Sequence, residues 1–371
     1  MIDITHDPTH FAADLGAKLA ARSRHVCAFL GAGVSRACGL PDVAGLEREV
    51  TDKLDGNQKD RFVGLLDGRN LEEVLSRLRR IAALLEGDQR IDELTADGSE
   101  ALDQAICTAI TQQLDLGRAD LKPMRLFAAW AARADYHDPL EVFSVNYDLL
   151  LETALEELRA LWFDGFVGTL TARFKVELVE GMPLDERDAL PGGFVRVWKL
   201  HGSLNWAWRG DPPEIVRLGG PVPEGQAAAI YPADTKYEES RRVPFVTLMD
   251  RFRRALQEPE SLVLVAGYSF RDAHLNEFIF DAAARRPRSE FLVFCHSSIP
   301  DEVSERAVRT PALSVVTKDE AILGGQRGKW AGNDATPGIW EGGHFLLGDF
   351  SSLAAFLARS QEREKESNER A

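Results

Sequence analysis

Short apolar runs alternate along the chain with longer stretches in which apolar side chains recur every three or four positions. Apolar runs that end in glycine or in a polar turn begin near residues 25, 140, 194, 261 and 290. Runs of this length are typical of buried strands, and a spacing of three or four is typical of helices. Strands that alternate with helices predict an α/β fold in which a parallel sheet is covered on both faces.

The longest helical region is expected between residues 45 and 134. Within it, the segment NLEEVLSRLRRIAALLEG opens with Asn70 and Glu73 at the positions of a capping box. Its apolar stripe consists of Leu71, Val74, Leu75, Leu78, Ile81, Ala82 and Leu85. A stripe with helical spacing is usually buried against other elements. We therefore interpret the region as a helical insertion and its stripe as packing surface rather than as a site.

The changes of pattern divide the chain into a core and two additions. Residues 1–44 and 135–300 carry the predicted strands and are expected to form the core. Residues 45–134 form the helical insertion, and parts of 205–257 are candidates for the same subdomain. Residues 301–371 are predicted to be a short C-terminal extension that ends in a charged tail.

The first predicted strand runs directly into a glycine-rich turn. Gly31-Ala32-Gly33 follows the apolar run, and Ser35 comes two positions later. A junction of strand, glycine and helix leaves backbone N–H groups unpaired at the positive end of a helix, which suits a phosphate. The match to a dinucleotide-binding fingerprint is incomplete, because Arg36 stands where the third glycine would lie. A glycine turn without a ligand stays the alternative for this stretch taken alone.

Three further predicted strands also end in polar turns. The four junctions lie at residues 31–35, 144–148, 200–202 and 267–272. The carboxyl ends of parallel strands meet at one edge of a sheet, so these turns are predicted to line one crevice. Their polar residues are Ser35, Asn146, Asp148, His201, Ser269 and Asp272. Each of them taken alone also fits a structural role as a helix cap, a turn former or a hydrogen-bonded histidine.

The balance of charge argues against several classes of partner. The formal net charge is −15, and no stretch clusters Lys and Arg with aromatic residues, so direct nucleic-acid binding is not expected. The longest apolar runs are far shorter than the roughly 20 residues that span a bilayer, so no membrane segment is expected. The N-terminal segment MIDITHDPTHF is acidic and polar, unlike a secretory signal. We predict a cytoplasmic protein.

The cysteines and histidines do not predict a metal site. The four cysteines are scattered without a C-x-x-C pair, which argues against a zinc ribbon. His6 and His10 have the spacing of helical metal ligands, but Asp7-Pro8 between them predicts a helix start. No third ligand candidate is near them, so no metal is expected.

Five short motifs occur in an order that resembles the sirtuin family. GAGVS is followed by GLPD, then by SVNYD, KLHG and GYSFRDAHLNEF, so that the likeness spans about residues 25–295. The arrangement is more similar to a divergent bacterial branch of that family, whose members consume NAD in antiphage defence. The resemblance implies a Rossmann-like NAD-binding sheet with a helical subdomain and without a zinc module.

The resemblance also implies roles for individual residues. The glycine turn would hold the pyrophosphate of NAD, and the segment 267–276 would hold the adenosine half. Asn146 would orient a water molecule or the ribose hydroxyls, Asp148 would orient this group, and His201 would act as the base. The predicted catalytic residues are Asn146, Asp148 and His201. The predicted NAD-binding residues are Gly31, Ala32, Gly33, Ser35, Pro41, Asp42, Ser144, Gly267, Ser269, Asp272 and Asn276.

Departures from the deacylating sirtuins change the expected acceptor. The chain has no four-cysteine zinc module, and Val43-Ala44 follows Pro41-Asp42 where those enzymes have Phe-Arg. Water, rather than an acyl-lysine peptide, is therefore expected to accept the ADP-ribosyl group of NAD. The predicted activity is an NAD+ glycohydrolase that releases nicotinamide and ADP-ribose, with cyclised ADP-ribose as a less favoured product. Two alternatives stay open: an NAD-dependent protein deacylase or ADP-ribosyltransferase, and a non-catalytic sensor of NAD or ADP-ribose.

An unrestrained enzyme that destroys NAD would kill its own cell, so gated activity is expected. The resemblance implies control by self-assembly into a homo-oligomer or by a separate protein, with a HerA-like hexameric ATPase as the favoured partner. The helical insertion is the expected assembly surface. The biological role implied by the resemblance is depletion of NAD+ during antiphage defence.

Overall fold

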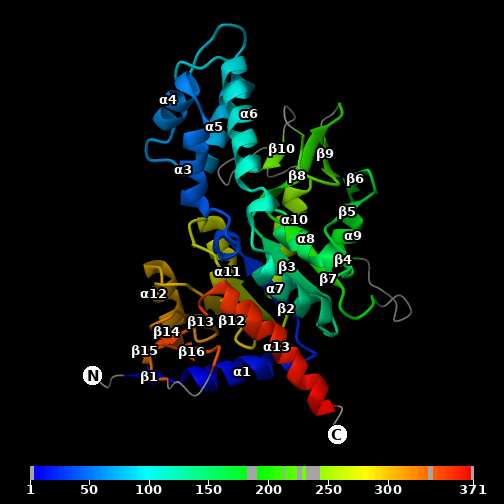
Figure 1. The fold of residues 1–371 in the computed structure, drawn as a ribbon, viewed down its shortest axis with the longest axis vertical. Helices are drawn as coiled ribbons and strands as arrows, with labels where there is room; N and C mark the ends of the chain where they lie inside the picture. The colour runs from blue at the N-terminus through cyan, green and yellow to red at the C-terminus, as the bar shows by residue number, and fades with distance from the viewer. Residues whose placement is uncertain are drawn as a thin grey trace.

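Among the residues that the structure describes, ten strands form one mostly parallel sheet at the centre of the molecule (Figure 1). The computed structural model describes residues 4–181, 190–211, 214–223, 228–230, 243–332 and 337–368. In spatial order the strands are β1 (Thr5–His6), β15 (Gln326–Trp330), β14 (Glu320–Leu323), β13 (Leu313–Val316), β12 (Glu290–Phe294), β11 (Leu262–Ala266), β2 (Val26–Leu30), β3 (Leu140–Ser144), β7 (Val195–Lys199) and β4 (Trp162–Phe163). Neighbours from β13 to β4 pair in parallel, and β14 is antiparallel to both of its neighbours. The α/β fold with a parallel sheet is therefore confirmed.

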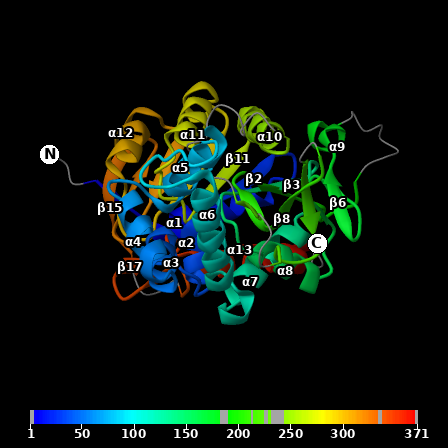
Figure 2. The same cartoon turned by 90° about the horizontal axis from the view of Figure 1, so that it is seen from above.

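Helices cover both faces of this sheet, as a continuous apolar strand requires. One face carries α1 (Pro8–Ala20), α2 (Ala32–Ala37), α7 (Lys122–Arg133), α8 (Leu150–Glu157) and α13 (Phe350–Asn368). The other face carries α10 (Phe245–Gln257), α11 (Ala273–Arg285) and α12 (Asp301–Arg309). Figure 2 shows α10, α11 and α12 on one side and α7, α8 and α13 on the other.

The side chains of β2 show how the two faces are built. Val26, Ala28 and Leu30 pack into the cluster beneath α1, α7, α8 and α13, whereas Cys27 and Phe29 pack toward α10, α11 and α12. All five are buried because successive residues of a strand point to opposite faces of the sheet. Each buried apolar side chain of this size contributes about 1.5–3 kcal/mol to folding.

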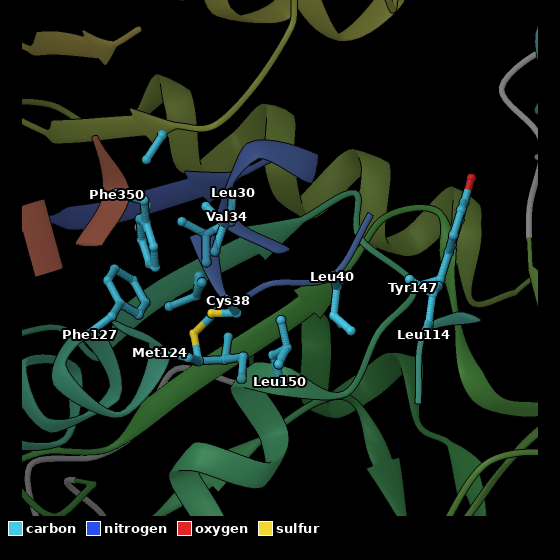
Figure 3. Packing of buried hydrophobic residues seen from close by; sticks show 14 of the residues in the cluster. Leu30, Val34, Cys38, Leu40, Leu114, Met124, Phe127, Tyr147, Leu150 and Phe350 are labelled. Atoms are coloured by element: carbon cyan, nitrogen blue, oxygen red, sulfur yellow. The ribbon is translucent and has the colours of Figure 1, made fainter. Parts of the chain in front are cut away.

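The apolar cluster beneath α1, α7, α8 and α13 extends to the carboxyl edge of the sheet. Figure 3 shows Cys38 and Met124 close together below Leu30 and Val34, with Leu150 beside them. Burial raises the pKa of the Cys38 thiol to about 12, which keeps it protonated and apolar in character. Apolar packing therefore fixes α2 against α7 and α8 directly below the turn that follows β2.

Four helices form a lobe that projects away from the sheet along the long axis of the molecule (Figure 1). This helical lobe consists of α3 (Val43–Lys53), α4 (Gly56–Leu65), α5 (Leu71–Leu84) and α6 (Ala96–Gln113), and a short 3-10 turn, η1 (Leu116–Arg118), follows it. The capping box is present: the Asn70 side chain accepts from the Glu73 N–H, and the Glu73 carboxylate accepts from the Asn70 N–H. Most of the predicted stripe is buried, but Ala82 and Leu85 are only partly covered.

Parts of the segment 205–257 were predicted to join the helical insertion, but the structure places its described residues elsewhere. Its described residues belong mainly to a second, antiparallel sheet and to α10, which packs on the main sheet. The second sheet contains β10 (Ala228–Ile230), β8 (Gly202–Arg209), β9 (Glu214–Leu218), β6 (Thr171–Phe174) and β5 (Phe166–Val167), with the short α9 (Val176–Glu180) beside it. The physical reason is the aromatic content of β8, because Trp206 packs against Phe166 and Phe245 instead of against a helix of the lobe.

Residues after 300 continue the main sheet. Strands β13, β14 and β15 extend it from β12, and a hairpin of β16 (Trp340–Glu341) and β17 (His344–Phe345) lies next to α1 through Phe11 and Phe345. Helix α13 then crosses to α7, where Phe350 contacts Phe127. The region predicted as a short extension thus supplies part of the sheet and one of its covering helices.

Candidate functional site

The strands β11, β2, β3 and β7 lie side by side and run parallel, so their carboxyl ends share one edge. The turns that follow them are the four junctions expected from the sequence, at residues 31–35, 144–148, 200–202 and 267–272. Their convergence on one crevice is confirmed. This is the edge at which open α/β sheets bind ligands.

Two adjoining cavities occupy this edge. One, of about 110 Å³, is lined by nine of the predicted site residues: Ala32, Ser35, Pro41, Asp42, Asn146, Asp148, His201, Ser269 and Asp272. The other, of about 510 Å³, is lined by Gly33 and Gly267 together with the end of β12 and the start of α13. The two share Ala32, Asp42 and Ser269, so they form one continuous crevice.

The glycine turn is shaped by the neighbouring chain. A Cβ atom on Gly31 would lie 2.6 Å from the Gly267 carbonyl oxygen, and one on Gly33 would lie 2.7 Å from the Gly267 Cα. The Gly31 N–H donates to Ala266, the Gly33 N–H to Gly267 and the Val34 N–H to Gly31. The expectation of several free N–H groups is therefore wrong for these three, because the end of β11 takes the first, the turn after β11 takes the second and the glycine turn itself takes the third.

Asn146 joins the turn after β3 to the glycine turn. Its Nδ2 donates to the Gly31 carbonyl oxygen at 3.0 Å, and its backbone N–H donates to the Ser144 Oγ at 3.1 Å. The side chain is largely buried and lines the smaller cavity. The bond to Gly31 uses one of the two N–H groups of Nδ2, so the second N–H and the amide oxygen are left for a ligand.

Asp148 is held by bonds within the protein. One carboxylate oxygen accepts from the Ser35 hydroxyl at 2.5 Å, and the other accepts from the Leu150 N–H at 3.1 Å. Its carbonyl oxygen accepts from the buried ammonium of Lys199, which also pairs with Glu152 at 3.1 Å. Asp148 and Ser35 therefore fix the turns after β2 and β3 against each other, and the predicted role of Asp148 in orienting the catalytic group stays a prediction.

His201 lies between two carboxylates in the smaller cavity. Its Nε2 is 3.5 Å from the Asp272 Oδ2 and its Nδ1 is 3.9 Å from the Glu72 Oε1, and only 5% of the residue is exposed. Both contacts are too long for good hydrogen bonds. Burial lowers the pKa of His201, but the contacts with Asp272 and Glu72 outweigh it and raise the pKa above 6.5.

The Nε2 atom of His201 has no hydrogen-bond partner among the described residues. A buried polar atom without a partner is uncommon in a folded protein, and it is explained most directly by a ligand or water that completes the site. His201 lines the smaller cavity together with the polar side chains of Asn146, Ser269 and Asp272, and the Asp272 Oδ2 is the carboxylate oxygen near its Nε2, at 3.5 Å. The chemistry of this set fits a hydroxyl-bearing ligand that gives up a proton to an imidazole.

Asp272 supports both the histidine and the helix that follows. Its Oδ1 accepts from the backbone N–H groups of His274 and Leu275, which caps α11, while its Oδ2 faces His201. Burial raises the pKa of Asp272, but the contacts with His201 and the two backbone N–H groups more than offset it, so that the net shift is downward. The side chain is therefore ionised near neutral pH.

Three predicted NAD-binding residues line neither cavity. Gly31 and Ser144 lie beneath the turns, and Asn276 is buried in α11. The Asn276 amide donates to the Phe270 carbonyl oxygen and accepts from the Tyr268 hydroxyl. In this structure Asn276 shapes the turn that carries Ser269, and its predicted contact with the adenosine half stays a prediction.

Several lining residues were absent from the expected site. They are Val43, Leu46, Asn70, Glu72, Leu114, Val145, Tyr147, Tyr268 and Arg271. Tyr147 and Tyr268 stand inside quoted motifs, so their position after a strand was a usable signal. Glu72 belongs to the stretch interpreted as packing surface, and nothing in its sequence neighbourhood indicates that it reaches His201.

The described residues contain neither a group suited to hold a metal ion nor a helix suited to span a membrane. Within them, no group of three or more His, Cys, Asp or Glu side chains is arranged to hold a metal ion. The four cysteines are free and buried. None of the helices in this part of the chain combines the length and apolar character needed to cross a membrane.

The fold and the crevice define an α/β protein whose polar site lies at the carboxyl ends of parallel strands. Within this class, residues 140–315 match the family described as SIR2-like domain, a stretch that carries Asn146, His201 and Asp272. This match supports a sirtuin-like relationship for that part of the chain. No curated protein matches the sequence. A solved complex of a mutant Sir2 homologue with ADP-ribose is similar to this chain at 14% identity, with a TM-score of 0.38, over 95% of this chain and 97% of its own.

Proposed function

We propose that the protein is an NAD+ glycohydrolase that cleaves NAD+ to nicotinamide and ADP-ribose. The observation that carries the proposal is the buried His201, whose Nε2 has no hydrogen-bond partner among the described residues and faces the same crevice as Asn146. The SIR2-like match of residues 140–315 supports an NAD-dependent reaction at this site. NAD+ is the substrate, and no resident cofactor enters the proposal.

The reaction needs little acid catalysis but careful positioning. When the bond between the ribose C1′ and the pyridinium nitrogen breaks, its electron pair stays on the nitrogen and nicotinamide leaves as a neutral molecule. A water oxygen then forms the new bond to C1′, and the water proton passes to the Nε2 of His201. Asn146 orients the water or the ribose hydroxyls, and exclusion of solvent from the crevice strengthens these contacts.

Two other activities are weighed against hydrolysis. A protein deacylase or ADP-ribosyltransferase would need a cleft for a polypeptide acceptor, and the smaller cavity of about 110 Å³ beside His201 favours water. A non-catalytic sensor of NAD or ADP-ribose would need no proton acceptor, whereas the Nε2 of His201 has no hydrogen-bond partner among the described residues. Both therefore rank below hydrolysis.

The biological role and the partners are proposed from the resemblance of the motifs. The enzyme would act in the cytoplasm and deplete NAD+ during antiphage defence, with activity gated by homo-oligomerisation or by a HerA-like hexameric ATPase. The helical lobe is the proposed assembly surface. Size-exclusion chromatography of the two proteins, alone and mixed, tests the association, and separate elution at micromolar concentration would contradict it.

Purified protein incubated with NAD+, alone and with the candidate ATPase, tests the activity itself. Chromatography should show nicotinamide and ADP-ribose appearing in equal amounts. His201→Ala should lower the rate by roughly 10²- to 10⁴-fold, the range expected for loss of a general base. His274→Ala is the matched control, because His274 is exposed on the next turn and lines neither cavity of the crevice. Intact NAD+ under both conditions, or equal losses in the two variants, would contradict the proposal.

A further inference from the structure

The first turn of α5 enters the crevice from the helical lobe. Asn70 and Glu72 both line the smaller cavity, although the rest of their helix packs within the lobe. The capping box between Asn70 and Glu73 fixes the backbone of this turn, with hydrogen bonds of 2.8 and 2.9 Å. The direction of the Glu72 side chain is therefore set by a rigid helix start rather than by a loose loop.

One carboxylate oxygen of Glu72 joins three segments. It accepts a hydrogen bond from the Tyr147 hydroxyl, and it lies 3.9 Å from the Nδ1 of His201. Tyr147 belongs to the turn after β3, and His201 to the turn between β7 and β8. Figure 3 shows the Tyr147 hydroxyl directed away from the apolar cluster around Cys38 and Met124, which leaves the hydroxyl on the side where it donates to Glu72.

The charged groups that face His201 come from two elements. Glu72 approaches its Nδ1 from α5, and Asp272 approaches its Nε2 from the N-terminus of α11. The third neighbour, Tyr147, stays neutral, because burial and the nearby Glu72 carboxylate raise its pKa well above 10. The side chain of Glu72 is 22% exposed, so solvent reaches it more readily than it reaches His201.

We propose that Glu72 is a positioning residue that orients the His201 imidazole through its charge on the Nδ1 side, opposite the Asp272 carboxylate on the Nε2 side. The inference rests on the proposed function for its kinetic consequence, but the contact itself does not depend on it. Because Glu72 is carried by the helical lobe, the orientation of the base depends on how that lobe sits over the sheet. A partner or a second copy that moved the lobe would thereby change the activity without touching the substrate.

The sign of the electrostatic effect follows from the charge of Glu72. A carboxylate beside an imidazole favours the protonated form, so removing the charge lowers the pKa of His201. A base must be unprotonated to accept the water proton, so the acid limb of the pH profile should move to lower pH. The same change should lower kcat, because the imidazole then loses one of the groups that fixes its orientation.

The first test measures the contact without any turnover. Nuclear magnetic resonance of ¹⁵N-histidine-labelled protein follows the titration of His201, which is assigned by the signal lost in His201→Asn. In Glu72→Gln the midpoint should move to lower pH. Glu73→Gln is the matched control, because it makes the same charge change in the same helical turn but keeps its cap. An unchanged midpoint in Glu72→Gln, or an equal shift in Glu73→Gln, would overturn the inference.

The second test measures NAD+ cleavage across pH. Glu72→Gln should lower kcat by less than the roughly 10²- to 10⁴-fold loss expected for His201→Ala, and should shift the acid limb. Tyr147→Phe keeps the Glu72 charge but removes its hydroxyl anchor, so it should lower kcat with a smaller shift of the limb. If the wild type cleaves no NAD+, the proposed function fails and the histidine titration still decides the role of Glu72. If NAD+ is cleaved and neither property changes in Glu72→Gln, the inference alone fails.

Discussion

The two ends of the same parallel strands hold buried charges in opposite ways. At the amino end, Glu141 is 1% exposed and its two carboxylate oxygens accept from His25, Trp198 and Arg251, with distances of 3.1 Å to the His25 Nε2, 2.6 Å to the Trp198 Nε1 and 2.7 Å to the Arg251 Nε. A second guanidinium nitrogen of Arg251 completes the set. At the carboxyl end, His201 has only the two long contacts with Glu72 and Asp272.

The difference separates a structural cluster from a candidate site. The amino end also borders a cavity of about 600 Å³, which is close to the volumes of about 510 and 110 Å³ that make up the crevice, so cavity volume does not separate the two ends. Hydrogen-bond satisfaction does separate them, because a buried network whose members are all paired stabilises the fold and has no atom to offer to a ligand. The Nε2 of His201 has no hydrogen-bond partner among the described residues and lies where parallel strands end, and this combination favours the carboxyl end as the candidate site.

The largest effect is expected when the amino-end cluster is broken, that is, the hydrogen-bonded group of Glu141 with His25, Trp198 and Arg251. Glu141→Gln removes the buried carboxylate that pairs with the partly buried guanidinium of Arg251, so the free energy of unfolding should fall by up to about 3–5 kcal/mol. Urea denaturation measures this loss, with Glu260→Gln as an exposed control.

The pH dependence of stability follows from the same contacts. Burial raises the pKa of Glu141, but the bonds from His25 and Arg251 outweigh burial and lower this pKa to about 2. Its stabilisation is therefore complete above the ordinary value of 4.5 and is lost as the pH falls toward 2. A Glu141→Gln protein as stable as the wild type would show that the satisfied cluster is not what stabilises this edge.

An intermediate effect is expected where the two turns of the crevice touch. Gly33→Ala forces a Cβ to within 2.7 Å of the Gly267 backbone, so the turns must separate, at a cost of about 1–3 kcal/mol. Calorimetric binding of NAD+ should weaken at the same time, because both turns line the crevice. Gly16→Ala is the control: its added Cβ meets no atom within 4 Å, and replacing glycine in a helix should stabilise the protein by about 0.5–1 kcal/mol. Equal stability of the two variants would contradict the close contact.

The smallest expected effect comes from the ion contacts of His201. Its pKa is raised in the folded protein, so its contribution to stability is present below the ordinary value of 6.5 and is lost as the pH rises through the folded value. The unfolding free energy of the wild type relative to His201→Asn should therefore decline from pH 6 upward by less than the Glu141 effect. Urea denaturation at a series of pH values measures it. A difference that grows with pH would show that burial outweighs the two carboxylates.

The elements and their meeting point were predictable because their signals are local. Each parallel strand is buried on both faces, so β2 and β11 are continuous apolar runs that end in glycine-containing turns. The rule that parallel strands share a carboxyl edge then predicts from the sequence alone that Asn146, His201 and Asp272 lie together. The second sheet was harder to predict, because its strands are short and depend on aromatic contacts such as Trp206 with Phe166.

By itself, the sequence determined which strands are buried, where they end and which polar residues follow them, since burial pattern and turn chemistry are properties of neighbouring residues. Only the tertiary structure decided that the Gly31 N–H bonds to the end of β11, that the Gly33 N–H bonds to the turn after it, and that Asn276 supports that turn. It alone brought Glu72 to His201. These contacts join segments far apart in the chain, and their distances follow from how the helical lobe and the covering helices pack, which no local pattern encodes.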